Sequence, residues 1–109
     1  EDDKDFAKKL IRKVIVNKEE FTGIVKEHAQ NWDTERIAQI DLLILQMAIA
    51  ELIEFSSIPV KVTLNEFIEI SKYYSTDKSK IFINGVLDNI IKELLKTGKI
   101  KKTGRGLIE

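Results

Sequence analysis

Hydrophobic residues recur every three or four positions along most of this chain, a spacing that predicts helices. The pattern predicts five of them, at about residues 5–16, 17–32, 33–56, 63–74 and 79–96. The third is apolar on nearly every side, which indicates a helix buried in the middle of the fold. Because no strand-like alternation occurs, we expect an all-α fold, an orthogonal bundle of about five helices.

Polar residues mark where these helices begin. Asn17 and a glutamate three positions later suit a helix start, and so does Asp33 or Thr34 before the third helix. Residues 63–66, Thr-Leu-Asn-Glu, have the form of a capping box and predict the start of the fourth helix. The segment 97–109 is basic and contains glycine, so we expect a flexible tail.

Composition limits the classes of protein to which the chain can belong. Its 109 residues suit one domain, and because Glu1 stands first in place of Met we expect a fragment of a longer chain. Eighteen basic and 18 acidic residues cancel, which removes any long-range attraction to nucleic acid or membrane. The absence of cysteine agrees with a cytoplasmic protein. The longest apolar run, residues 42–53, is too short to cross a bilayer.

Residues that perform catalysis or bind metals are scarce. The single histidine, His28, lies on the apolar stripe of the second helix and suits a position in the core or at its edge. One histidine supports neither a metal site nor a Ser-His-Asp arrangement, and no glycine-rich phosphate loop follows a strand. We therefore expect no metal, no cofactor and no enzymatic activity.

The start of the fifth helix departs from its apolar stripe. At 100° per residue, Ile81 and Phe82 lie well off the stripe and next to Lys78 and Lys80. An aromatic ring beside lysines at a helix N-terminus suits RNA, since the ring stacks on a base and the cations contact phosphate. The alternative is that both residues pack on the tyrosines just upstream or on another helix. Asn84, one turn further on, suits a bond to a neighbouring loop or a contact with RNA.

Asp41 is an acid inside the apolar third helix, between Ile40 and Leu42. A lone buried carboxylate is costly, so Asp41 either reaches the surface or has a partner. An interface with a partner protein is a further interpretation of this position.

A collinear set of residues adds a family signal: Trp32, Arg36–Ile37, Ile40–Leu45, Glu51–Leu52, Ile58–Pro59, Val62, Asn65–Glu66, Lys72 and Phe82–Asp88. In this order and spacing they resemble the middle and C-terminal part of the NusB family, the bacterial transcription antitermination factors. The resemblance covers roughly residues 3 to 96. The family's arginine-rich N-terminal helices have no match in this chain.

The resemblance implies an all-α fold and a non-catalytic function. It implies binding to the boxA element of ribosomal RNA operons together with the ribosomal protein NusE, within the antitermination complex of RNA polymerase. Asp41 is similar to an acidic position that the family uses toward NusE. Lys78, Lys80, Phe82 and Asn84 resemble its RNA-contact segment.

Two other functions remain open from the sequence. One is a NusB-like RNA-binding module of a ribosomal RNA cytosine methyltransferase, and the other is a helical module that binds only proteins. The zero net charge and the missing basic N-terminal part favour the second of these. A homodimer is a further partner that the sequence leaves open.

Overall fold

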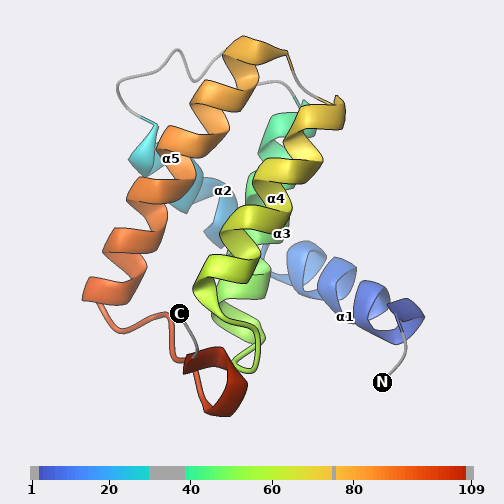
Figure 1. Cartoon of the computed structure of the whole chain (residues 1–109), viewed down its shortest axis with the longest axis vertical. Helices are drawn as coiled ribbons and strands as arrows, with labels where there is room; N and C mark the ends of the chain where they lie inside the picture. Colours follow the sequence, from blue (N-terminus) through green and yellow to red (C-terminus); the bar gives the residue numbers. More distant parts are fainter. Residues whose placement is uncertain (1–2, 30–38, 75, 108–109) are drawn as a thin grey trace.

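Every regular element in the described part of the chain is helical. A computed structural model describes residues 3–29, 39–74 and 76–107, so Trp32, Asp33 and Thr34 lie outside the described residues. The expected all-α fold is confirmed (Figure 1). The helices are α1 (Asp3–Val16), α2 (Lys18–His28), α3 (Gln39–Glu54), α4 (Val60–Tyr74) and α5 (Asp77–Lys96), followed by the short 3₁₀ helix η2 (Gly104–Leu107).

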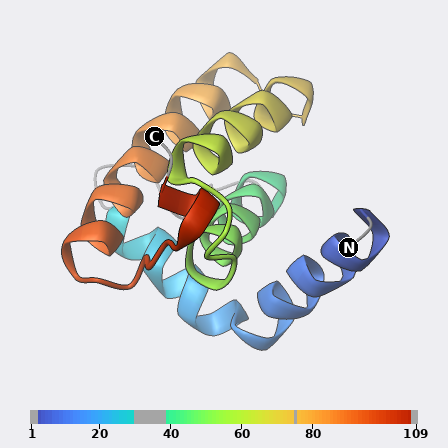
Figure 2. The same ribbon diagram turned by 60° about the horizontal axis from the view of Figure 1, so that its bottom comes forward.

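Helix α3 is the centre of the bundle, as its apolar pattern predicts. It packs against α1, α2, α4 and α5, and Figure 2 shows these helices arranged around it. Its first turns reach solvent at Ile40 and Leu43, and its last residue, Glu54, is exposed as well. The buried apolar side chains of α3 are Ile44, Leu45, Ala48, Ile49, Ala50 and Leu52.

Two short connections set the directions of the last three helices. The link between α3 and α4 spans residues 55–59, and the link between α4 and α5 spans residues 75–76. Such short links hold neighbouring helices antiparallel. The N-terminus of α3, the C-terminus of α4 and the N-terminus of α5 therefore lie at the same end of the bundle, the top in Figure 1.

Helix α4 begins three residues before the predicted capping box. The carbonyl of Pro59 accepts hydrogen bonds from the amides of Val62 and Thr63, at 3.1 and 3.2 Å. Proline suits a helix start, because its fixed φ angle is already helical and its missing N–H is not needed there. Thr63 does not cap the helix; it is buried and donates its hydroxyl to Glu51 Oε1 at 2.7 Å. The predicted start was wrong because this hydroxyl binds another helix.

Two other helix starts also differ in detail from the sequence patterns. Asn17 precedes α2 but makes no side-chain cap, and its Nδ2 donates instead to the carbonyl of Lys13 at the end of α1. Helix α5 begins at Asp77, earlier than predicted, because Thr76 Oγ1 accepts a hydrogen bond from the amide of Ser79 at 3.1 Å.

The segment after α5, expected as a flexible tail, packs against the end of α3. Ile100 is buried. Lys102 Nζ donates to the carbonyl of Phe55 at 2.8 Å, and the amide of Thr103 donates to the carbonyl of Ser56 at 3.0 Å. Carbonyls at a helix C-terminus lack partners within the helix, so a lysine and a backbone amide satisfy them well. The composition of this segment predicted a tail, because composition does not reveal contacts with residues that are distant in the sequence.

Glu51 is fully buried where α3, α4 and the C-terminal segment meet. Burial raises the pKa of its carboxyl from the ordinary 4.5 to about 7. The hydrogen bond from Thr63 and the charge of Lys102 lower this pKa, while the charge of Glu66 raises it. Glu51 Oε2 has no hydrogen-bond partner among the described residues. In the folded protein the carboxyl is therefore mostly protonated below about pH 7, where an ordinary glutamate is ionised down to about pH 4.5.

The central role of α3 predicts a large difference between two leucines of this helix. Leu45 is fully buried, whereas Leu43 is 43% exposed. We expect Leu45→Ala to lower the free energy of unfolding by roughly 2–5 kcal/mol, because it leaves a cavity in the core. Leu43→Ala, the matched control, should cost less than half as much. Urea denaturation measures both, and equal losses would contradict the central position of α3.

Glu51 predicts how stability depends on pH. Because the folded state holds this proton more tightly than the unfolded chain, stability should fall as pH rises from 4.5 to about 7. Glu51→Gln keeps an acceptor for Thr63 and carries no charge. We expect the variant to be more stable than the parent at pH 8 by roughly 1–3 kcal/mol, and nearly equal to it at pH 4. Denaturation at both pH values measures this, and an unchanged pH dependence would refute it.

Candidate functional site

The three helix termini at one end of the bundle bring together most of the residues singled out in the sequence. Lys78 and Lys80 lie in the first turn of α5, and Asn84 one turn further on. Asp41 lies in the first turn of α3. We call residues 72–74 and 76–81, at the junction of α4 and α5, the α4–α5 tip.

The α4–α5 tip exposes two aromatic side chains that the sequence analysis did not assign to a site. Tyr73 is 78% exposed and Tyr74 is 66% exposed. On α5, Ile81 is 66% exposed. The sequence contains a signal for this arrangement, since the buried residues Thr63, Phe67 and Ser71 follow one face of α4. At 100° per residue, Tyr73 lies about 200° from Ser71, on the opposite face.

The lysines at the tip differ in their pairing. Lys78 is exposed and makes no ion pair with a described residue. Lys80 is partly buried, and its Nζ lies 2.9 Å from Asp77 Oδ1. Lys80 lowers the pKa of the Asp77 carboxyl through this hydrogen bond and through its charge. Asp77 therefore neutralises much of the charge of Lys80, and Lys78 is the more available cation for a phosphate.

The N-terminus of α5 is less open to an anion than the sequence suggested. The amide of Ser79, which has no partner within the helix, already donates a hydrogen bond to Thr76 Oγ1. Asp77 places an acid in the first turn, where it interacts with the positive end of the helix dipole. A bound phosphate would compete with both groups.

Ile81 is exposed, as its position off the stripe predicts, whereas Phe82 is buried although it also lies off the stripe. The Phe82 side chain is 8% exposed and belongs to the core, so the expected exposed ring was wrong and the alternative, packing within the fold, holds. The reason is that α5 packs against both α4 and α2, so its buried face is wider than one stripe. In this arrangement the ring offers little surface to a base, whereas Asn84 is exposed on the same edge of α5 as Ile81.

Asp41 is buried, with 4% of its surface exposed, and it does not lack a partner. We expected Asp41 either to reach the surface or to have a partner, and the structure agrees with the second expectation. Ile40 and Leu43, which flank it in the sequence, are exposed apolar side chains. The start of α3 thus combines an acid with accessible apolar surface.

Two classes of site find no support in the described residues. Within them, no three metal-binding side chains of the His, Cys, Asp or Glu type gather in one place. Over the same ranges, no helix is both long and apolar enough to cross a membrane.

Comparisons with known proteins agree with the resemblance. The model of the NusB family matches residues 1–92. The transcription antitermination protein NusB of Salinibacter ruber is 48% identical over 105 residues, which are 96% of this chain and 66% of that protein. The protein of the same name from Chloroherpeton thalassium is 44% identical over 106 residues, which are 97% of this chain and 50% of that protein. These names describe a transcription factor and no enzyme.

A solved structure shares the fold. The structure of T. maritima NusB superimposes with a TM-score of 0.79 at 34% sequence identity, and covers 90% of this chain and 70% of that one. The chain spans one half to two thirds of the length of the two sequence relatives. With the family model matched over most of its residues, the chain belongs to the NusB family.

Proposed function

We propose that this chain is part of a transcription antitermination factor that binds RNA and a protein partner without catalysis. The observation that carries the proposal is the pair of exposed tyrosines beside the unpaired Lys78, at one tip of a NusB-family fold. The names of the sequence relatives support antitermination as the process. The finer assignment is boxA-type RNA of ribosomal RNA operons, bound together with NusE in the RNA polymerase complex.

The α4–α5 tip has the two chemical elements that single-stranded RNA requires. Tyr73 and Tyr74 offer aromatic faces on which bases stack, at about 1–3 kcal/mol for each base. Lys78 offers a cation to a phosphate, with a contribution that weakens as salt rises. Asn84 and Lys80 complete the surface, and Phe82 would contact RNA only through the small part of its ring that reaches the surface.

The start of α3 is the proposed surface for the protein partner. Ile40 and Leu43 supply the exposed apolar area, and Asp41 lies buried between them in the sequence. Exposed apolar surface suits a protein interface better than a nucleic acid. Because the start of α3 lies at the same end of the bundle as the α4–α5 tip, NusE bound there would lie near the RNA (Figure 1).

Two substitutions at the tip test the RNA surface. Tyr74→Ala should weaken binding of a labelled boxA-type RNA by roughly 5- to 150-fold, the range for one lost stacking contact. Lys78→Gln should weaken binding and lower the slope of log affinity against log salt by about 0.7. Fluorescence anisotropy with and without NusE measures both effects, and NusE should tighten the binding of the parent chain.

The matched control is Lys8→Gln on α1, which removes an exposed lysine far from the tip and should leave the affinity unchanged. Equal affinities for the parent, Tyr74→Ala and Lys78→Gln would reject the tip as the RNA surface. No binding of the RNA, with or without NusE, would favour the module that binds only proteins.

A further inference from the structure

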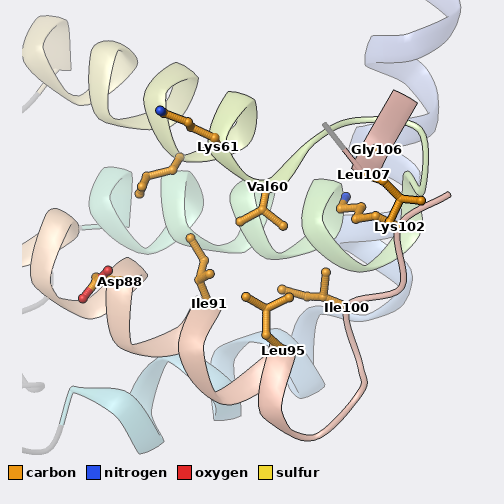
Figure 3. A pocket seen from close by; sticks show the side chains of 10 residues that line it. Val60, Lys61, Asp88, Ile91, Leu95, Ile100, Lys102, Gly106 and Leu107 are labelled. Atoms are coloured by element: carbon orange, nitrogen blue, oxygen red, sulfur yellow. The ribbon is translucent and has the colours of Figure 1, made fainter. Parts of the chain in front are cut away.

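A groove lies at the opposite end of the α4–α5 pair from the tip. It runs between the start of α4, the second half of α5 and the C-terminal segment, and it encloses about 580 Å³ (Figure 3). This volume lies within the range of about 300–1,000 Å³ that is typical of ligand sites. The apolar residues that line it are Val60, Leu64, Ile91, Leu95, Ile100 and Leu107.

The apolar lining is open to solvent at two places. Leu95 is 50% exposed and Leu107 is 67% exposed, and both side chains belong to the lining in Figure 3. Exposed leucines that share one concave surface are typical of a binding site, whereas scattered exposed leucines are ordinary. The C-terminal segment builds one wall of this groove through Ile100 and Lys102, and the hydrogen bonds of Lys102 to α3 carbonyls hold that wall in place.

The charge around the groove is strongly one-sided. Lys61 lies in the lining, is exposed and makes no ion pair with a described residue. The one acid in the lining, Asp88, is already paired with Lys92 Nζ at 2.9 Å. Four more exposed cations, again without an ion pair to any described residue, lie at the end of α5 and on the segment that follows it: Lys96, Lys99, Lys101 and Arg105.

We propose that this groove binds a short acidic and hydrophobic peptide segment of a partner protein. Apolar side chains of the peptide would fill the space between Leu64, Leu95 and Ile100, and its carboxylates would face Lys61 and the basic wall. Charge complementarity favours an acidic partner, since Lys61, a lining residue without an ion pair to any described residue, is positive and the nearby segment adds further cations. RNA is disfavoured because the lining contains no aromatic side chain for a base to stack on. This site is distinct from the proposed RNA surface.

Selection from a random-peptide display library on the immobilised whole chain provides the probe. We expect the selected peptides to be rich in Asp or Glu together with Leu, Ile or Phe. A labelled peptide from this set should lose at least about tenfold in affinity on Leu95→Glu and on Lys61→Glu, as expected for an interface anchor. Both positions are exposed, so both variants should fold, which circular dichroism checks.

Matched controls on α1 make the test specific. Ile15→Glu and Lys8→Glu introduce the same charge at an exposed aliphatic residue and an exposed lysine outside the groove, and should leave peptide affinity unchanged. Peptides without acids, no selected peptide, or binding that survives Leu95→Glu would overturn the proposal. So would self-association of the chain that Leu95→Glu abolishes, or RNA affinity that falls on Leu95→Glu, since each assigns the groove to another occupant.

Discussion

The structure depends on the burial of α3 on nearly all its sides. Leu45, Ala48, Ile49 and Leu52 are fully buried, and four other helices pack around them. Each buried leucine or isoleucine contributes about 1.5–3 kcal/mol to the stability of the bundle. A helix that must be covered all round also requires neighbours on every side, and this requirement sets the arrangement of the bundle.

The same arrangement creates two surfaces that differ in chemistry. Short links on either side of α4 bring three helix termini to one end, where Tyr73, Tyr74 and Lys78 are exposed. At the opposite end, the C-terminal segment folds back onto α3 and walls a groove that is apolar inside and basic outside. Aromatic faces suit bases, whereas an aliphatic lining suits peptide side chains. The two proposed binding surfaces therefore suit different partners.

Periodicity alone predicted the helices and the central position of α3, because both follow from apolar spacing. Details that depend on contacts between distant residues were not predictable. Thr63 has the sequence spacing of a helix cap, but its hydroxyl bonds to Glu51 on another helix. Phe82 lies off the apolar stripe of α5, but it is buried because α5 packs against more than one helix. The basic segment after α5 was expected to be flexible, yet Lys102 finds carbonyls about 50 positions earlier. The exposure of Tyr73 was visible in the sequence, because this residue lies opposite the buried face of α4.

The most direct test of the RNA surface is the change in amide chemical shifts when boxA-type RNA is added to the whole ¹⁵N-labelled chain. The account predicts the largest changes at Tyr73, Tyr74, Lys78 and Ile81, with small changes at Leu95 and along α1. Changes concentrated on residues 96–105, or on α1, would contradict it and assign RNA binding to another part of the molecule.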